Sequence, residues 1–450
     1  MPARRSVVAV TRLDERAATR RLLDRFGFGP GPGELDAAAA RGVDATLDAV
    51  LAPAGPDPGV AATPPPSLTP APRSTKAMTQ DQAAKKAQQQ ARRTAQQQVT
   101  AWWMDRMTAA THALPERLTW FWHGHFATSA QKVNEPVYLL AQNETLRRLG
   151  SGDFGALAQA MAVDPAMLVW LDGRSNRVGA PNENLAREFM ELFALGVGHY
   201  TETDVREAAR ALTGWTIDPS SSGAVLVGRR HDAGPKTILG QTATFDTAGL
   251  VSMIVDLPAS ARFVANRLWF RLVSATPPEP AVMEQLVAAY GPRRDVRALL
   301  QAIATSAPFR DTATALVKQP VEWAVGLMRA TGVRASALPA TGATSLASRM
   351  TELGQVPFRP PSVGGWPPAT SFLTPAGGLT RLAIAETVLA HATIPPGPAT
   401  PAAQLDWAQA VLGVDAWSAR TATALRGVAG GDPRQLLAVA AVTPEYMVST

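Results

Sequence analysis

The 450-residue sequence contains no cysteine, and this absence excludes several kinds of chemistry. Without cysteine the chain can form no disulfide, no thiolate nucleophile and no Cys-ligated zinc or iron–sulfur centre. Long apolar runs are also missing, since no stretch reaches the roughly 18 residues of a membrane-spanning helix, and we expect no transmembrane segment. Any reaction must therefore rest on other polar side chains.

Clustered charge is missing as well. Charged residues make up 18% of the chain, and the formal net charge is +6. Nucleic-acid-binding proteins usually gather positive charge in blocks, whereas the most basic stretch, AAKKAQQQARR, is interrupted by Ala and Gln. The sequence does not favour a nucleic-acid partner. The apolar content of 46% is enough for a sizeable core.

Helical patterns dominate the chain. We expect an N-terminal helical segment at 1–51 that packs on the main domain, a Pro-rich linker or loop at 52–78, and a main helical domain at 79–450. Strand-like segments with Gly and Ser around them occur near 218–247. The fold class predicted is mainly α: a large multi-helix single domain with a small β-hairpin insertion near residues 218–247.

The N-terminus carries one short apolar run, SVVAV, and charged residues follow it directly. Such a run is too short for the apolar region of a signal peptide. We therefore expect a cytoplasmic protein.

Two carboxylates, Glu188 and Glu191, lie three positions apart in the segment PNENLAREFMELF. On a helix they share a narrow polar stripe with Asn184 and Arg187. Carboxylates at this spacing can bind one metal ion or flank a substrate. The alternative is a ladder of ion pairs, in which Glu183 pairs with Arg187 at i, i+4.

His123 and His125 stand within the aromatic segment TWFWHGHF. On an extended backbone their side chains would point the same way and could chelate one metal ion, whereas on a helix they would diverge. Histidines among aromatic residues are also common as satisfied core residues. Both interpretations stay open at this stage.

The loop segment HDAGPK contains His231, Asp232 and Lys236. A carboxylate beside an imidazole raises its basicity and fixes its tautomer, so the pair can serve a metal or acid–base site. The same dipeptide also occurs in ordinary loops. No nucleophile elbow, phosphate loop, dinucleotide fingerprint or zincin motif is present in the sequence.

Several blocks together resemble the domain-of-unknown-function 1800 family: WFWHGHF, PNENLAREFMELFALGVGHYTETDVREAARALTGW, HDAGPKTILG, ARFVANRLWFRLVS and VGGWP. They follow one another in the order of the family. The resemblance implies a bacterial protein that is often encoded beside a member of the domain-of-unknown-function 1501 family, which looks related to sulfatases and phosphatases. It also implies export as the alternative to a cytoplasmic location.

These observations lead to one main hypothesis and two alternatives. The main hypothesis is an enzyme with a buried polar site, a hydrolase by default, which uses metal-activated water on an anionic small molecule. Imidazole and carboxylate ligands suit a divalent metal ion, Zn, Mn or Fe. The candidate metal ligands are His123, His125, Glu188, Glu191 and His231. The candidate catalytic and substrate-binding residues are Asp232, Arg187, Arg210 and Lys236. The alternatives are a non-catalytic helical binding or scaffold protein that acts with a partner encoded nearby, and a metal-dependent oxidoreductase.

Overall fold

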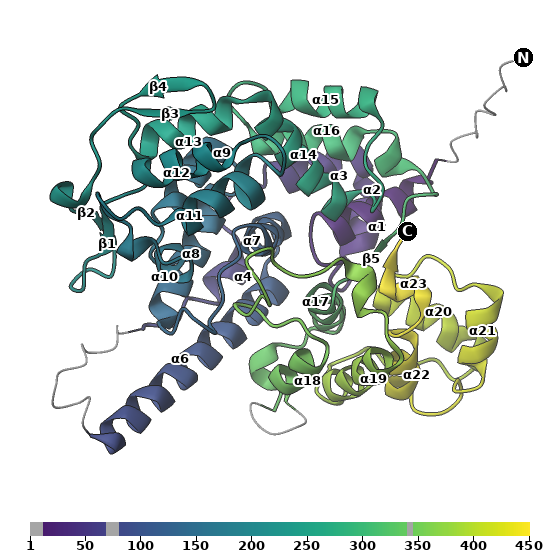
Figure 1. Ribbon diagram of the computed structural model, residues 1–450. Helices are drawn as coiled ribbons and strands as arrows, with labels where there is room; N and C mark the ends of the chain where they lie inside the picture. Colours follow the sequence, from purple (N-terminus) through teal and green to yellow (C-terminus); the bar gives the residue numbers. More distant parts are fainter. Residues whose placement is uncertain (1–11, 69–80, 340–344) are drawn as a thin grey trace, which may run out of the picture.

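The computed structural model describes residues 12–68, 81–339 and 345–450, and most of these residues are helical (Figure 1). Within the described ranges the strands form two-stranded antiparallel pairs and no larger sheet. The predicted mainly α fold is therefore confirmed. The N-terminal apolar run and residues 69–78 of the predicted linker lie outside the described residues.

The N-terminal segment folds into four helices, which are α1 (Glu15–Arg25), α2 (Glu34–Arg41), α3 (Val43–Leu51) and α4 (Pro58–Ala61). Leu22 of α1 and Phe26, its C-cap, belong to a hydrophobic core that is shared with the helices of residues 113–305. The helix α4 lies inside the predicted linker. Its N-cap, Asp57, accepts hydrogen bonds from the backbone N–H groups of Thr111 and His112, so this part of the linker is attached to the main body.

The long helix α6 (Gln82–Ala109) is mostly exposed over its first half and mostly buried from Val99 onward. Its free end projects from the body of the molecule (Figure 1). This agrees with the sequence, which is polar on every face at first and apolar around Trp102 and Trp103.

One hydrophobic core, the first core, is built mainly from residues 113–309. Its helices are α7 (Ala113–His125), α8 (Pro136–Leu149), α9 (Phe154–Ala162), α10 (Pro165–Trp170), α11 (Glu183–Glu188), the π-helix η2 (Phe189–Ala194), α12 (Glu202–Ala211), α13 (Thr247–Asp256), α14 (Pro258–Leu272), α15 (Pro280–Tyr290) and α16 (Val296–Thr305). Side-chain caps begin many of them, including a capping box in which Thr201 and Asp204 bind each other's backbone N–H groups.

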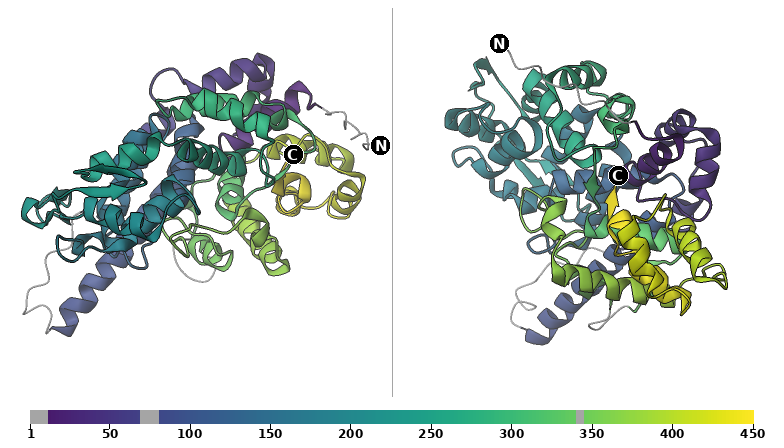
Figure 2. Two further views of the ribbon diagram at one scale, coloured as in Figure 1. Left: turned by 45° about the horizontal axis from the view of Figure 1, so that its top comes forward. Right: turned by 90° about the vertical axis from the view of Figure 1, so that its right-hand side faces the viewer.

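The second core gathers the C-terminal helices around α17. These helices are α17 (Pro320–Thr331), α18 (Leu346–Glu352), α19 (Pro375–Ala390), α20 (Pro401–Leu412), α21 (Ala419–Arg426), α22 (Pro433–Ala440) and α23 (Pro444–Met447). Both views in Figure 2 show α20 to α23 gathered on one side of the molecule, while Leu139 of α8 and Ala166 of α10 also belong to the second core. Short 3-10 helices join the longer elements: η1 (Gly173–Ser175), η3 (Gly228–Arg230), η4 (Pro308–Arg310), η5 (Ala335–Ala337) and η6 (Ala369–Phe372).

The region expected to hold one β-hairpin contains two. They pair β1 (Trp215–Ile217) with β2 (Ala224–Leu226), and β3 (Lys236–Ile238) with β4 (Gln241–Ala243). A third pair joins β5 (Leu316–Val317) to β6 (Val448–Ser449). This last pair brings residues near the end of the chain against α1 and beside the start of α17.

The helix α7 lies between the two cores. Leu118 and Trp122 belong to the first core, whereas Trp120 belongs to the second. The chain therefore places one face of α7 where the two cores meet, and the cavities described below open there.

In the described ranges no single helix is both long and apolar enough to cross a membrane. The helices α13 and α14 reach that length and composition only together, and they meet at an angle of 76°.

Candidate functional site

The predicted metal ligand His123 is buried in an aromatic shell. Its ring packs edge-on against Trp103 and lies near Phe358 and Trp366. Its Nε2 atom accepts a hydrogen bond of 3.1 Å from the backbone N–H of Phe358. Burial lowers the pKa of His123 to about 3, so the ring is neutral near pH 7.

The second histidine, His125, faces a different environment because the segment is helical. Its Nε2 lies 2.7 Å from the carbonyl oxygen of Phe193, and its Nδ1 accepts a hydrogen bond of 3.4 Å from Nε of Arg267. These partners fit a neutral ring that carries its proton on Nε2. Burial first, and then the charge of Arg267, hold the pKa of His125 well below its usual value.

The two carboxylates Glu188 and Glu191 lie near each other where α11 continues into the π-helix η2. Burial raises the pKa of Glu188, and the negative charge of Glu191 raises it further. Glu191 accepts a hydrogen bond of 2.6 Å from the hydroxyl of Tyr200. The structure thus brings these two predicted ligands together, in contact with a tyrosine.

Two arginines that we expected to hold an anionic substrate already contact carboxylates. Arg187 lies 2.7 Å from Glu202 and 3.1 Å from Glu183. Arg210 lies 2.8 Å from Asp232 and also pairs with Glu207. The Glu183–Arg187 pair is the ion pair that the sequence suggested as the alternative to a metal or substrate site. Asp232 forms its ion pair with Arg210.

Lys236 and His231 bind backbone carbonyl groups. The Nζ atom of Lys236 donates to the carbonyl oxygens of Asp232 (2.6 Å) and Gly234 (2.9 Å). Nδ1 of His231 lies 3.0 Å from the carbonyl oxygen of Thr213. Polar side chains of the loop 231–236 therefore hold it in place, through hydrogen bonds within the loop and contacts to the end of α12.

The five predicted metal ligands do not form one group. In the ranges that the structure describes, no cluster of three or more His, Asp or Glu side chains is arranged to hold a metal ion. Glu188 approaches Glu191, and Asp232 approaches Arg210, but the histidines contact their own separate surroundings. The bound metal and its ligand set stay predictions from the sequence.

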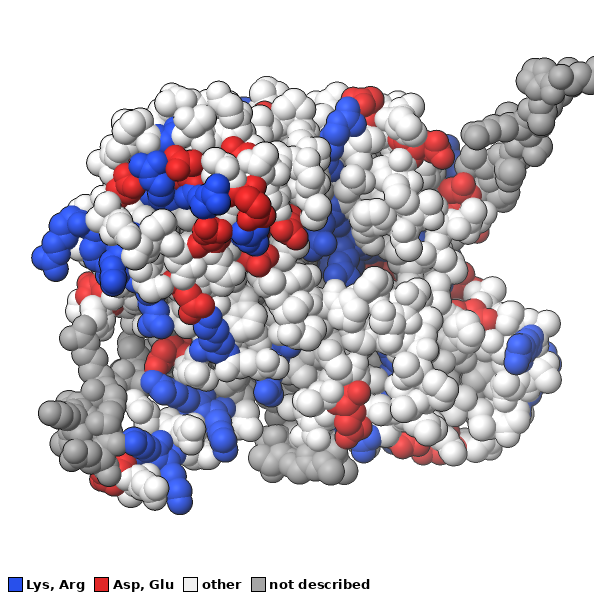
Figure 3. Space-filling view, viewed as in Figure 1, with Lys and Arg blue, Asp and Glu red and all other residues white. Residues whose placement is uncertain are grey.

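Another group of charged side chains lines a cavity between the two cores, which we call the outer cavity. It has a volume of about 430 Å³, and α14, β5 and the start of α17 contribute to its wall. Figure 3 shows Lys and Arg surfaces in a hollow at the corresponding place, near the centre of that face. Five basic and two acidic side chains line the outer cavity: Arg25, Arg117, Arg267, Arg271 and Lys318, with Asp24 and Glu322.

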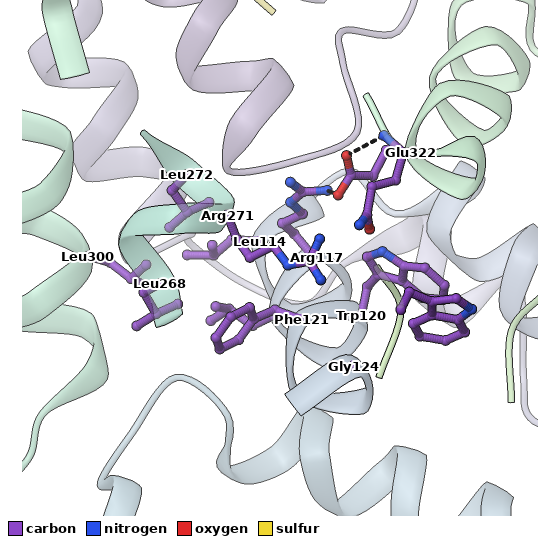
Figure 4. A pocket seen from close by; sticks show the side chains of 13 residues that line it. Leu114, Arg117, Trp120, Phe121, Gly124, Leu268, Arg271, Leu272, Leu300 and Glu322 are labelled. Carbon is purple, nitrogen blue, oxygen red and sulfur yellow. Dashed lines mark hydrogen bonds and ion pairs between the residues drawn. The ribbon is translucent and has the colours of Figure 1, made fainter. Parts of the chain in front are cut away.

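A smaller inner cavity of about 20 Å³ adjoins the outer one (Figure 4). Both cavities are lined by the same five residues, which we call the shared rim: Arg117, Arg271, Gln319, Glu322 and Trp366. The rest of the inner wall is apolar and consists of Leu114, Leu118, Trp120, Phe121, Gly124, Leu268, Leu272 and Leu300. A space of this size holds about one water molecule or methyl group.

Some of the charges at these cavities compensate one another. Nη1 of Arg117 lies 2.5 Å from Oε1 of Glu322, while Oε2 of Glu322 accepts the backbone N–H of Gln319 and so caps α17. Nζ of Lys318 lies 3.0 Å from the buried carboxylate of Asp24. Each of these acids therefore has its own basic partner.

Three arginines at the outer cavity have no carboxylate within ion-pair distance among the described residues. Arg267 and Arg271 lie one turn apart on α14, and Arg25 donates to the backbone carbonyl groups of Val273 and Ser449. Arg271 makes no hydrogen bond in the described ranges, and burial lowers its pKa to about 10 although Glu322 opposes that shift. Figure 4 shows Arg117 directed at Glu322, with the side chain of Arg271 beside it.

The residues of this region carry few signals in the sequence. Arg267 and Arg271 do stand four apart in ARFVANRLWFRLVS, a helix that is otherwise largely apolar, and this spacing was a usable signal. Trp366 belongs to VGGWP, a segment that indicates the family resemblance but no site. No local sequence pattern indicated that Arg117, Gln319 and Glu322 line the same cavity.

The fold and this region define a mainly helical protein with a basic cavity between two hydrophobic cores. The model of the family described as "Protein of unknown function (DUF1800)" matches residues 21–448, and the chain belongs to that family. No curated protein and no solved structure matches the chain.

Proposed function

We propose that this protein binds an anionic small molecule in the outer cavity. The observation that carries the proposal is the pair Arg267 and Arg271, one turn apart at the cavity without a carboxylate partner. A charge removed from water is costly unless it is compensated, so positive charges gathered in this way favour a bound anion. The volume of about 430 Å³ lies within the range typical of small-molecule sites.

Arginine suits this role because of its geometry. The planar guanidinium group offers two parallel N–H donors to a carboxylate or phosphate. A cavity with low-dielectric walls also strengthens the attraction beyond its value in water. His125 accepts a hydrogen bond from Arg267 and so helps to orient that guanidinium group. A sequence-predicted histidine thereby acquires a positioning role.

The proposal is tested by measuring the melting temperature of the protein against increasing inorganic phosphate, sulfate or acetate at constant ionic strength. Binding to the folded state raises the melting temperature as the anion concentration rises. The variant Arg271→Gln should lose this response. Its unliganded form should melt at the same or a higher temperature than the wild type, because an uncompensated charge has been removed.

Arg262→Gln is the matched control. Arg262 lies on the same helix, but it is exposed and pairs with Glu284 at 2.5 Å on the surface. This variant should keep the full response to anions. The proposal fails if none of the three anions changes the melting temperature of the wild type, or if Arg271→Gln responds like the wild type.

A second proposal retains the metal-dependent hydrolase. It is supported by Glu188 and Glu191, neighbouring carboxylates at a π-helix, since π-bulges are frequent at functional sites. Elemental analysis of the purified protein is the test, with Glu188→Gln expected to lose any bound metal. Less than about a tenth of an equivalent of metal in the wild type, with no change in melting after a chelator, would favour the scaffold alternative. Binding to a purified domain-of-unknown-function 1501 protein would test the proposed partner.

A further inference from the structure

The inner cavity differs chemically from the outer one. Beyond the shared rim its wall consists of Leu, Phe and Trp side chains and Gly124. We infer that the ligand is a carboxylate with a short apolar end: its carboxylate lies on the shared rim, and its terminal methyl group fills the inner cavity. This inference rests on the proposed anion-binding function and narrows the class of ligand.

The shared rim holds several hydrogen-bond donors and a single carboxylate. Nε2 of Gln319 and Nε1 of Trp366 are buried and have no hydrogen-bond partner in the part of the chain that the structure describes. Arg271 also lacks a partner there. Glu322, the one acid, is already bound to Arg117 and to the cap of α17.

Buried donors without acceptors are costly, so a shared rim with several such donors and one compensated acid favours an oxyanion over a cation. The first turn of the 12-residue helix α17 begins directly after Gln319, and the positive end of a helix dipole also favours an anion. The donors on the rim and the helix end thus favour the same kind of group.

The size and the apolar wall of the inner cavity distinguish between classes of oxyanion. Its volume of about 20 Å³ fits one small group, and its walls beyond the rim include Phe121, Leu268 and Leu300. A water molecule needs two to four polar partners, and beyond the shared rim these walls supply none, whereas a methyl group needs none. Phosphate and sulfate have no apolar atom to place there. A carboxylate with a short aliphatic end occupies both the rim and the inner cavity.

The test is a calorimetric series of formate, acetate, propionate, butyrate and hexanoate, with inorganic phosphate as the reference anion. Affinity should rise from formate to propionate by up to about fourfold per buried carbon, as expected for about 0.8 kcal/mol per CH₂ group. It should not rise further for butyrate or hexanoate. All of this binding should be lost in Arg271→Gln.

Gly124→Ala reduces the inner cavity with little risk to the fold. A Cβ atom at Gly124 would lie 3.6 Å from the ring of Trp366, which is an ordinary contact, and alanine favours the helix. This variant should bind phosphate and formate as the wild type does. The ratio of its affinity for propionate to its affinity for formate should fall to about one.

The results of this series distinguish failure of the short-chain inference from failure of the proposed anion site. If phosphate binds in an Arg271-dependent way but the carboxylates show no dependence on chain length, the short-chain inference is wrong and the anion site stands. If affinity keeps rising through hexanoate, the inner cavity does not limit the ligand, and the inference is also wrong. If no anion binds the wild type, the proposed function fails together with the inference.

Discussion

Gly124 and Gly365 approach each other so closely that a Cβ atom on Gly365 would lie 2.2 Å from the carbonyl oxygen of Gly124. Gly365 also has a positive φ of 82°, a conformation that L side chains rarely adopt. The contact joins α7 to the loop before η6 and places the neighbouring Trp366 against Trp120, with ring centroids 4.8 Å apart. Two distant glycines thus bring Trp366 to the shared rim.

The first prediction concerns this contact. Gly365→Ala should lower the free energy of unfolding by more than about 2 kcal/mol, because it adds both a steric overlap and a strained φ. Urea denaturation measures the effect. Gly364→Ala is the control, since its Cβ would meet nothing closer than Oγ of Ser362 at 3.6 Å. Equal stability of the two variants would contradict the close approach.

The second prediction concerns acid and His123. The pKa of His123 in the folded state is about 3, below the ordinary histidine value of about 6.5. Between these two pH values the unfolded chain is protonated at His123 and the folded chain is not. The stability contributed by the neutral ring is complete above pH 6.5 and declines as the pH falls toward 3. The decline is at most about 1.4 kcal/mol per pH unit.

The variant His123→Gln isolates this contribution, because the glutamine side-chain oxygen can still accept the N–H of Phe358. The stability difference between wild type and variant should shrink as the pH is lowered from 7 to 4 in urea denaturation. A difference that is constant over this range would show that His123 titrates alike in both states.

Much of the fold follows from local sequence signals. The segment after Thr201 has both an apolar stripe and a capping box, and the helix α12 begins where these predict. The turn signals near 218–247 indicated hairpin structure, but they did not reveal that there are two hairpins. The pair β5–β6 could not be predicted, because its strands are two residues long and lie far apart in the chain.

The candidate site was harder to predict, for a physical reason. Arg187 and Arg210 have acidic residues three or four positions away, and this spacing suggested a polar site. In the structure the same acidic residues form ion pairs with the two arginines. Arg117, Arg271 and Glu322 meet only through the packing of α7, α14 and α17. Charges from distant helices that converge at a cavity leave no periodic pattern in the sequence.

The third prediction concerns the pH range from 4 to 7 and Asp164, the buried N-cap of α10. It accepts hydrogen bonds from Met167 and Gln142, yet burial raises its pKa to about 7. The unfolded pKa is about 4, so the folded state holds an additional proton between these values. The stability that this proton contributes is complete below pH 4 and is lost as the pH rises through 7.

Asp164→Asn removes the titration and leaves an oxygen that can cap the helix. The variant should therefore gain stability relative to the wild type as the pH rises from 4 to 7, and the difference should be constant above pH 8. Asp153→Asn is the control, because Asp153 caps α9 in the same way but is exposed. Parallel pH curves for wild type and Asp164→Asn in thermal unfolding would refute the assignment.

The fourth prediction concerns Glu322. Glu322→Gln keeps an oxygen for the N–H of Gln319 but removes the charge beside Arg117. The guanidinium group of Arg117 is then buried without compensation, and the free energy of unfolding should fall by about 3 kcal/mol. Glu386→Gln, an exposed change on α19, should have almost no effect.

The same variant should bind anions more tightly, because Arg117 joins Arg267 and Arg271 as an uncompensated cation. Phosphate should raise the melting temperature of Glu322→Gln more than that of the wild type and so recover part of the lost stability. A variant that is destabilised but no more responsive to phosphate would mean that the carboxylate of Glu322 does not compete with ligands for these arginines. In that case the anion would be bound by the two arginines of α14 alone.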